Sequence, residues 1–349
     1  ELAQQGLEVV LVDKGLCGTE ASWAGGGIVS PLYPWRYSNP ITALSEWSQS
    51  YYPNLIQSLE AESDIDPELT RHGMLMLDVA GQEDALRWSG ARQPNWIESI
   101  DAEHVYQLEP GLRKGCDGAL WMPNISSVRN PKLLQALRVV LDREPLITVI
   151  EENGLDSLIK EKDKVQGLLT TRGDRVMGDA VLLCTGAWTQ GLLETQFETG
   201  IEPVKGQMVL FEAKPGVVNR VVLGGGRYVI PRRDGRVLAG STLEYQGFDK
   251  TTTRSAHDEL SDMAIDMFPE LAKYSLRHHW AGLRPGSPDG LPYIGKLPGT
   301  ENLYVNAGHF RNGLVLAPAS VRLMTSILTD VVEPVDARPY DPRLRLLSE

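Results

Sequence analysis

The sequence is short of cysteine, of positive charge and of long apolar runs, and each shortage excludes a class of protein. Its three cysteines show no CxxC spacing and cannot form a closed set of disulfides, which favours a reducing, cytoplasmic compartment. There are 34 basic residues against 46 acidic ones, a net charge of −12, so no nucleic-acid-binding surface is expected. The longest apolar runs have the length of a buried strand, far below the ~20 residues of a membrane-spanning helix. We therefore expect no stable membrane insertion.

What is present is ample material for a hydrophobic core. Of the 349 residues, 42% are hydrophobic and 23% are charged, which is typical of a folded globular protein. At roughly 150 residues per domain, this length predicts two domains.

The first segment of the chain has the pattern of a nucleotide-binding unit. Glu1–Gly6 reads as the last turns of a helix that ends on a glycine, and Leu7–Asp13 as a buried parallel strand that ends on an acidic residue. In a dinucleotide-binding βαβ unit this acid binds a ribose hydroxyl, about 20 residues after the glycine turn that seats the pyrophosphate. We therefore expect the first strand and that turn to precede Glu1. On this segment alone, an ordinary αβ unit with an exposed Asp13 is an equal alternative.

Two further segments suit close approach to a flat ring. The loop Ala21–Pro31 contains three consecutive glycines, which lack the Cβ atom that would hold a ring away from the backbone. A flexible turn is the alternative, but the apolar residues on both sides favour a packed loop. The apolar strand Ala180–Cys184 ends in Thr185-Gly186, another place where main chain passes beside a nucleotide, and we expect Cys184 itself to lie in the core.

A long helix is predicted after the glycine loop. Asn39-Pro40 predicts the start of a helix with a kink at Pro53. Its expected buried stripe consists of Leu44, Trp47, Tyr51, Leu55 and Leu59.

The segment Tyr228–Ser241 predicts a hairpin with Asp234-Gly235 as a two-residue type I′ turn, which places Tyr228 opposite Ser241. Periodicity alone favours a packing role for this tyrosine over a ligand contact.

The C-terminal third contains the candidate chemistry. Trp280–Gly295 is rich in glycine and proline, so we expect a stiff and mostly non-repetitive segment. Arg284 stands there in an apolar context with no nearby acid, which suits bidentate capture of a carboxylate. A structural ion pair with a distant Asp or Glu is the alternative.

A glycine-bounded loop, Ala307–Gly313, then leads into a helix expected from Leu314 to about Val331. Free N–H groups at a helix N-terminus would stabilise negative charge on a ring carbonyl in front of them. Arg311 is a second candidate anion ligand. The adjacent His278 and His279 would point to opposite faces of a strand, and there is no HExxH motif, so no metal site is expected.

Five segments together resemble one family: Ser22–Gly27, Val204–Gly206, Tyr228–Pro231, Trp280–Gly295 and Gly308–Gly313. They are similar to the FAD-dependent amine oxidases of the D-amino acid oxidase group, and most of all to the glycine oxidases of the thiamine pathway. The resemblance extends over nearly the whole chain.

The resemblance implies an α/β fold with two domains. A discontinuous Rossmann-like FAD-binding domain would comprise residues 1–66, 126–202 and 282–349. A mixed α+β substrate domain, built on an antiparallel sheet, would comprise residues 67–125 and 203–281. The cofactor would be FAD, and the family further implies a homo-oligomer.

It also implies roles for individual residues. The catalytic group would comprise Arg284 as the ligand of the substrate carboxylate, Tyr228 as its hydroxyl partner and Arg311 at the pocket mouth. Asp13 would bind the adenosine ribose. The remaining residues expected to bind the cofactor are Ser22, Trp23, Ala24, Gly25, Gly26, Gly27, Leu155, Thr185, Gly186, Trp188, Gly308, His309, Phe310, Arg311, Asn312, Gly313 and Leu314.

The reaction implied is oxidation of glycine and other small amines or D-amino acids by O2. Hydride transfer to flavin N5 would give an imine, then a 2-oxo acid and ammonia, with hydrogen peroxide as the second product, and glycine imine would serve thiazole synthesis. A quinone-coupled D-amino acid dehydrogenase, a sarcosine-type secondary amine oxidase and a catalytically silent flavin-binding module stay open as alternatives. An NAD-linked dehydrogenase is disfavoured, because the loop after Asp13 and the C-terminal helix match flavin use.

Overall fold

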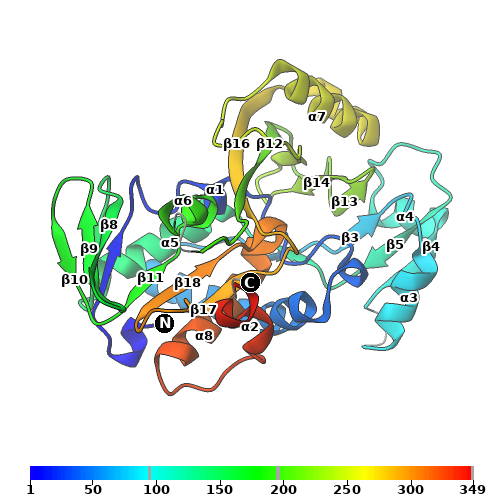
Figure 1. Cartoon of the computed structure of the whole chain (residues 1–349). Helices are drawn as coiled ribbons and strands as arrows, with labels where there is room; N and C mark the ends of the chain where they lie inside the picture. The colour runs from blue at the N-terminus through cyan, green and yellow to red at the C-terminus, as the bar shows by residue number, and fades with distance from the viewer. Residues whose placement is uncertain (93–95, 194–196, 347–349) are drawn as a thin grey trace.

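The computed structural model describes residues 1–92, 96–193 and 197–346 and shows an α/β protein with several mixed sheets (Figure 1). The strands are β1 (Val9–Val12), β2 (Thr70–Arg71), β3 (Met74–Met76), β4 (Glu98–Asp101), β5 (Gly118–Met122), β6 (Ser126–Ser127), β7 (Ile147–Ile150), β8 (Leu155–Glu161), β9 (Lys164–Thr170), β10 (Arg175–Met177), β11 (Val181–Leu183), β12 (Glu202–Phe211), β13 (Val221–Gly224), β14 (Arg227–Pro231), β15 (Val237–Gly240), β16 (Leu276–Gly286), β17 (Tyr293–Lys296) and β18 (Leu303–Ala307).

The α-helices are α1 (Ala21–Ala24), α2 (Asn39–Ser63), α3 (Gln82–Gly90), α4 (Ala102–Leu108), α5 (Asn130–Arg143), α6 (Thr189–Leu193), α7 (Arg254–Met267), α8 (Gly313–Leu328) and α9 (Pro342–Arg345). The 3-10 helices are η1 (Ala3–Gln5), η2 (Pro34–Arg36), η3 (Gly186–Trp188), η5 (Pro269–Lys273), η6 (Phe310–Asn312) and η7 (Arg338–Tyr340).

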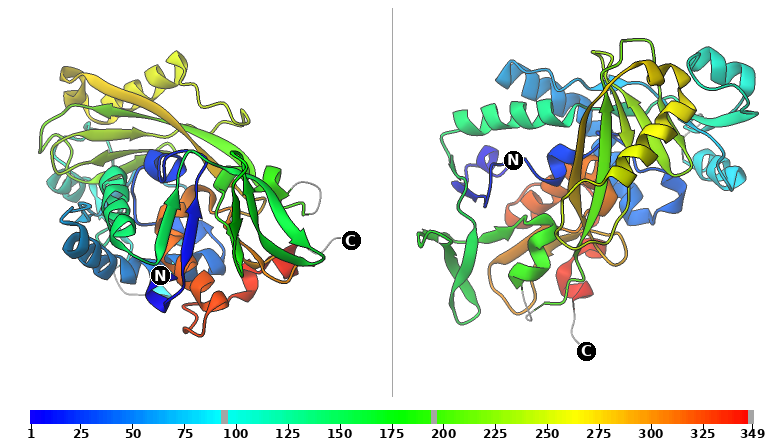
Figure 2. Two further views of the ribbon diagram at one scale, coloured as in Figure 1. Left: turned by 90° about the vertical axis from the view of Figure 1, so that its left-hand side faces the viewer. Right: turned by 90° about the horizontal axis from the view of Figure 1, so that it is seen from above.

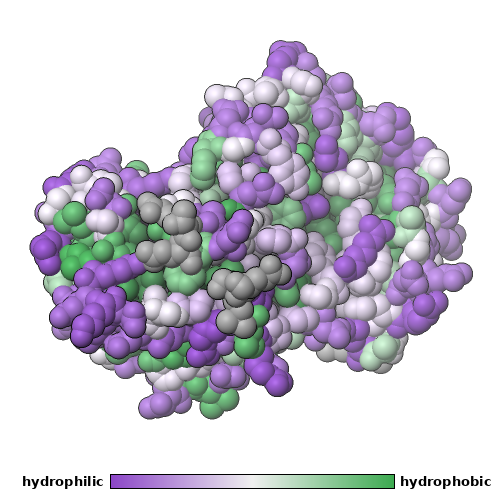
Figure 3. Space-filling view, in the orientation of Figure 1, coloured by the Kyte–Doolittle hydropathy of each residue, from purple (hydrophilic) through white to green (hydrophobic). Residues whose placement is uncertain are grey.

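The largest sheet has eight strands in the order β16-β12-β15-β14-β13-β3-β5-β4. It joins two distant stretches of the chain, because β13 pairs in parallel with β3. The other pairings within this sheet are antiparallel. Helix α7 buries Ala256, Leu260 and Ala264 against this sheet, and its outer surface, at the top of the molecule, is hydrophilic in Figure 3.

Parallel pairs and long helices form the other half of the molecule. β1 pairs in parallel with β7, and β11 with β18. Helices α2, α5 and α8 pack together around one hydrophobic cluster that includes Leu44, Leu133 and Leu316. Figure 2 shows these helices in two further orientations. The mixture of parallel pairs, helices and a large sheet confirms the α/β class, whereas the division into two domains stays a prediction.

Helix α2 begins close to the predicted residue and contains Pro53, but the predicted stripe is partly wrong. Leu44 and Leu59 are buried, whereas Trp47, Tyr51 and Leu55 are only half-buried. The buried face runs instead through Ile41, Leu44, Ser48, Tyr52 and Ile56. The reason is the position of α8, since the Tyr52 hydroxyl donates to the Leu314 carbonyl oxygen at 2.6 Å.

The hairpin between β14 and β15 has a different turn from the predicted one. Tyr228 lies opposite Gly240, one residue away from the predicted partner Ser241, and Arg232 N–H donates to the Arg236 carbonyl. The loop therefore has three residues. A type I′ turn needs positive φ at both central residues, but only Gly235 has it, at +90°. A glycine at the left-handed position of a three-residue loop explains the shift.

Two further expectations are corrected at exposed positions. The strand predicted over Leu7–Asp13 forms only as Val9–Val12 and is not fully buried, since Val10 is 45% exposed. Cys184, expected in the core, follows the end of β11 and is exposed.

Two features are absent from the described residues. None of the helices in the described ranges is long and apolar enough to cross a membrane. Within the same ranges, no group of three or more His, Cys, Asp or Glu side chains could hold a metal ion.

Candidate active site

Arg284 lies in strand β16, which corrects the expectation of a non-repetitive segment there. Val204 of β12 is its cross-strand partner, and the antiparallel pairing with β12 continues to Gly286 despite the neighbouring prolines. A long ladder therefore overrides the local glycine and proline signal and holds the arginine on a rigid element.

The guanidinium of Arg284 is held by neutral acceptors. Nη2 donates to Ser241 Oγ at 2.7 Å, and Nη1 donates to the Thr242 carbonyl at 3.2 Å. The group also lies directly against Gly206, where an added Cβ would come within 2.2 Å of both terminal nitrogens. Among the ion pairs of the described residues, none involves Arg284, so the alternative of a structural ion pair finds no support.

The charge around this arginine is positive. Burial lowers the pKa of Arg284, the neighbouring Tyr228 hydroxyl acts in the opposite direction, and the charge of Arg311 lowers the pKa further. Arg311 is exposed in η6. A hydroxyl beside Arg284 and the charge of a second arginine acting on it suit the binding of a carboxylate.

Tyr228 connects this arginine with the glycine loop. It is 8% exposed, and its hydroxyl lies 3.9 Å from Met208 Sδ. A Cβ added to Gly26 would lie 3.4 Å from the same hydroxyl and 2.9 Å from Ile230 Cδ1. The tyrosine therefore packs, as periodicity alone indicates, and also borders the proposed pocket.

The glycine loop is packed and hydrogen-bonded, as predicted. The buried side chain of Arg232 donates to the Gly26 carbonyl at 2.9 Å and to the Val128 carbonyl at 2.8 Å. Gly27 has φ of +85°, and an added Cβ would lie 2.1 Å from the Val128 oxygen. Only glycine fits here, which leaves bare backbone between the sheet and helix α1.

Helix α1 brings the rest of this segment against β16. Trp280 Nε1 donates to the Ala24 carbonyl at 3.0 Å, and the rings of Trp23 and Trp280 meet edge to face with centroids 5.8 Å apart. Asn130 donates from Nδ2 to the Ser22 carbonyl at 2.7 Å. Ser22, Trp23 and Ala24 thus border the same region as Arg284.

The loop before α8 also reaches the strand that holds Arg284. His309 forms a bridge with Gly286 at the end of β16, and Ser287 Oγ donates to the Gly308 carbonyl at 2.9 Å. Burial lowers the pKa of His309 to about 4, so the ring is neutral at pH 7 and meets Ser320 Oγ at 3.0 Å. Helix α8 starts at Gly313, one residue before the predicted start, after Phe310 and the buried Asn312.

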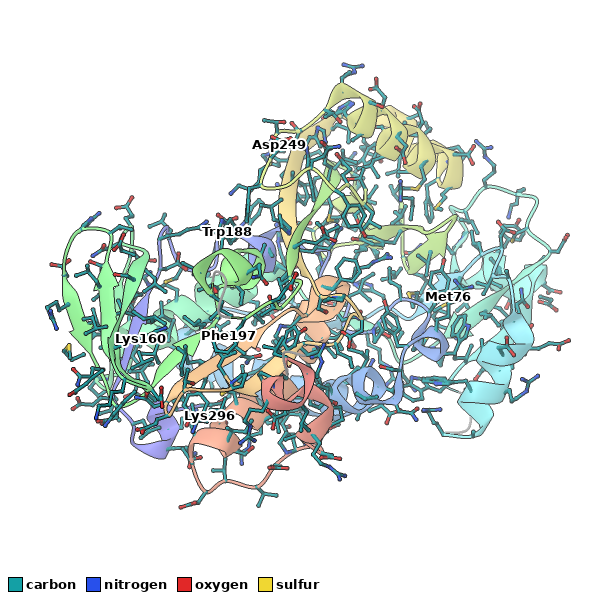
Figure 4. The ribbon with its side chains drawn as sticks, viewed as in Figure 1. Met76, Lys160, Trp188, Phe197, Asp249 and Lys296 are labelled. Atoms are coloured by element: carbon teal, nitrogen blue, oxygen red, sulfur yellow. The ribbon has the colours of Figure 1, made fainter. Side chains whose placement is uncertain are left out.

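Gly186 of η3, shortly after β11, faces open space. An added Cβ at Gly186 would meet no atom within 4 Å, and Thr185 Oγ1 is hydrogen-bonded to Thr189. Trp188 stacks on Phe248 with centroids 5.5 Å apart, and Lys14 Nζ lies 3.1 Å from the centre of the indole. Figure 4 labels Trp188, which directly precedes helix α6.

The last two predicted cofactor ligands lie directly after β1 and at the start of β8. Asp13 Oδ1 accepts from the Gly15 amide at 2.8 Å. Leu155, the first residue of β8, packs against the cluster around Val165 and Leu183. Among the described residues, no hydrogen bond or ion pair joins Asp13 or Leu155 to Arg284.

Sequence reasoning assigned no role in the site to four residues that shape it, although it placed Gly206 in a family segment and Ser241 opposite Tyr228. They are Gly206, Arg232, Ser241 and Thr242, whose contacts are described above. The hairpin register could have indicated Ser241, because it directly follows the residue opposite Tyr228. Arg232 and Gly26 are 206 residues apart in the chain, so no local sequence pattern predicts their contact.

Comparison with known proteins places these features in one family. The model of a family described as FAD dependent oxidoreductase (DAO) matches residues 1–327. A relative from Pseudomonas aeruginosa named glycine oxidase is 47% identical over 347 residues, 99% of this chain and 95% of the relative. A crystal structure of glycine oxidase from Geobacillus kaustophilus superposes with a TM-score of 0.90 at 26% identity, covering 97% of this chain and 93% of the other.

A third relative has a longer chain. The bifunctional protein ThiO/ThiG of Synechocystis is 29% identical over 336 residues. Those residues are 95% of this chain but 49% of the relative, so the match extends over about half of the bifunctional protein.

Proposed function

The chain belongs to the DAO family of FAD-dependent oxidoreductases, and from this premise we propose that it oxidises glycine, with other small amino acids as further substrates. O2 is the proposed electron acceptor, and the products are an imine, which hydrolyses to a 2-oxo acid and ammonia, and hydrogen peroxide. The 47% identity to a glycine oxidase over nearly the whole of both chains supports this choice of substrate.

One observation supports the proposal most strongly: a partly buried arginine whose hydrogen-bond partners are neutral. Ser241 and Thr242 hold the Arg284 guanidinium in place without neutralising it. A buried cation that lacks a counter-ion is costly, and a substrate carboxylate removes that cost on binding. The Tyr228 hydroxyl beside it supplies a further donor.

The glycine loop fits a flat cofactor. Side chains at Gly26 and Gly27 would collide with Ile230 and with the Val128 carbonyl, so the backbone itself forms the surface. We assign the FAD site to this loop, to Thr185 to Trp188, to Gly308 to Leu314, to Leu155 and to Asp13. The first helical turn of α8 would place free N–H groups beside the ring system.

Bound FAD supplies the two-electron acceptor for the Cα–H bond of the substrate. The residues of this chain bind and orient: Arg284 and Tyr228 fix the carboxylate, which fixes the direction of the Cα–H bond. Positioning of this kind contributes much of the rate in such reactions, so no side-chain general base is needed. His309 is neutral and hydrogen-bonded to Ser320, which suits support of the loop rather than proton transfer.

The product indicates a place in metabolism. The ThiO/ThiG relative carries the similar region and a further region in one chain. We propose that the glycine imine formed here serves thiazole and thiamine synthesis. A homo-oligomer in the cytoplasm and the two-domain division given above are further parts of this proposal.

An amine panel tests the proposal directly. The flavoprotein is supplied under air with glycine, sarcosine and small D-amino acids, and hydrogen peroxide is measured. We expect peroxide in proportion to oxidised glycine, and bleaching of the yellow flavin band by glycine under argon. Bleaching with transfer to an added quinone but no peroxide would support a quinone-coupled dehydrogenase instead, and no bleaching would support a silent binding protein.

A further inference from the structure

We propose that Lys205 is a positioning residue for the substrate carboxylate, because it neutralises Glu244 and so leaves the guanidinium of Arg284 without a counter-ion. The inference rests on the proposed function only in taking a carboxylate as the ligand of Arg284. Lys205 lies in β12, next to Val204, the cross-strand partner of Arg284. Because neighbouring residues of a strand point to opposite faces, Lys205 lies behind the site.

The segment that holds Arg284 is itself tied to an acidic residue. Ser241 and Thr242 accept from the guanidinium, and Thr242 Oγ1 donates to Glu244 Oε1 at 2.5 Å. Burial alone would raise the pKa of Glu244, but hydrogen bonds from Thr242 and Gln207 and the charge of Lys205 hold it below its ordinary value. A carboxylate that is ionised at pH 7 thus stands two residues from the carbonyl bound to Arg284.

Lys205 is the cation that faces this carboxylate. Its side chain is 1% exposed, and Nζ lies 2.9 Å from Asp249 Oδ2 and 3.7 Å from Glu244 Oε2. Two main-chain hydrogen bonds between Lys205 and Glu244, at 2.9 and 3.0 Å, fix the two residues side by side. Asp249, labelled in Figure 4, also accepts from the amide and hydroxyl of Thr251.

Removal of this lysine would change the partner of Glu244. Charges a few ångströms apart interact strongly where water is scarce. Without the ammonium, Glu244 stays linked to Arg284 through Thr242, which donates to the acid from Oγ1 and accepts from the guanidinium at its carbonyl oxygen. The acid would then compete with the substrate carboxylate, so substrate binding would weaken while the steps after binding would proceed as before.

A second lysine on the same segment provides a matched control. Lys250 Nζ lies 3.0 Å from both carboxylate oxygens of Glu20, on the side of the segment where Phe248 stacks on Trp188. This ion pair anchors the segment, but no hydrogen bond given for Lys250 or Glu20 reaches Ser241, Thr242 or Glu244. Lys250→Met therefore removes an anchor of the segment without removing the cation beside Glu244. Comparison with Lys205→Met separates the two effects.

The test compares Lys205→Met, Lys250→Met and the double variant Lys205→Met/Glu244→Gln in the flavin-bound protein. The readouts are KM and kcat for glycine, and the dissociation constant of glycolate, a carboxylate without an amine, measured from the flavin absorbance. For Lys205→Met we expect at least about a tenfold rise in KM and in the glycolate constant, with kcat within about twofold. For Lys250→Met we expect both binding constants within about twofold of the parent.

The double variant decides between charge balance and packing. Because Glu244→Gln removes the competing charge, we expect it to return the glycolate constant to within about threefold of the parent. Unchanged binding in Lys205→Met, or a double variant that binds more weakly than Lys205→Met, would overturn the proposal.

A failure to fold and a failure of the proposed function are both distinguishable outcomes. If Lys205→Met does not fold, Glu244→Gln alone decides, since it must bind glycolate at least as tightly as the parent, and weaker binding contradicts the proposal. If the parent protein does not oxidise glycine, the proposed function fails, and the glycolate constants still decide the role of Lys205.

Discussion

The guanidinium of Arg284 lies against Gly206 of β12. Gly206 is two residues after Val204, which is the cross-strand partner of Arg284. A Cβ at this glycine would come within 2.2 Å of both terminal nitrogens and 2.4 Å of the central carbon. The glycine therefore fixes where the cation can lie, and with it where a carboxylate can bind.

The Gly206→Ala variant should displace the guanidinium and weaken substrate binding. We expect KM for glycine to rise by about tenfold or more, since bidentate carboxylate binding depends on the position of the fork. Steady-state kinetics with peroxide detection measures this. Gly90→Ala is the matched control, because a Cβ there would meet no atom within 4 Å. An unchanged KM in Gly206→Ala would show that the arginine can move without loss.

The Tyr228→Phe variant tests the hydroxyl beside the arginine. A hydrogen bond to a charged group contributes about 1.5–3 kcal/mol, so KM for glycine should rise by about tenfold to a hundredfold. Tyr340→Phe serves as the control, because its hydroxyl donates to the Pro40 carbonyl at 2.7 Å in the helical half. That control should lower stability and leave KM unchanged. Equal effects on KM in both variants would assign Tyr228 to packing alone.

The Asp13→Ala variant tests the proposed ribose contact. The carboxylate should contribute to FAD affinity, so we expect FAD to bind about tenfold more weakly. Titration of flavin-free protein with FAD, followed by flavin fluorescence, gives the dissociation constant. Asp262→Ala, at an exposed position on α7, should leave that constant unchanged. The same affinity in both variants would remove Asp13 from the cofactor site.

The half-buried His309 should make the protein less stable in acid. Burial lowers its pKa in the folded protein to about 4, against an ordinary value of 6.5, so the unfolded chain binds a proton more readily. The contribution of this histidine to stability is complete above pH 6.5 and is lost as the pH falls from 6.5 to 4, up to about 3 kcal/mol. Urea unfolding of the parent and of His309→Gln at pH 7 and 4.5 measures it. The free energy of unfolding should fall less in the variant, and equal decreases would contradict this account.

The sequence predicted elements well where the signal is local. The helix signalled by Asn39-Pro40, the hairpin of β14 and β15 and the packed glycine loop are all present. The α/β class is what the family resemblance implies. Errors appear where tertiary contacts decide. Tyr52 rather than Tyr51 faces the core because α8 lies on that side of α2.

In the candidate site, too, local signals point to some residues and only tertiary contacts reveal the others. Local composition pointed to Arg284 and the glycine segments, whereas periodicity favoured packing for Tyr228 and only the family resemblance gave it a role in the site. Gly206, Ser241 and Thr242 act on the arginine only because β12, β15 and β16 are neighbours, and this adjacency is a property of the sheet. Lys205 lies within Val204–Gly206, one of the segments that carry the resemblance, but no role followed from it, since a lysine within a strand is ordinarily read as exposed.

The most direct test of the central claim is glycolate binding to the Arg284→Ala variant, measured by flavin absorbance beside Arg277→Ala on the same strand, whose arginine pairs with Glu212. Loss of a charge-assisted bidentate contact should raise the dissociation constant by about a hundredfold or more, with a normal flavin spectrum. Arg277→Ala should bind as the parent does. Binding by Arg284→Ala at the parent's affinity would show that this guanidinium does not hold the carboxylate.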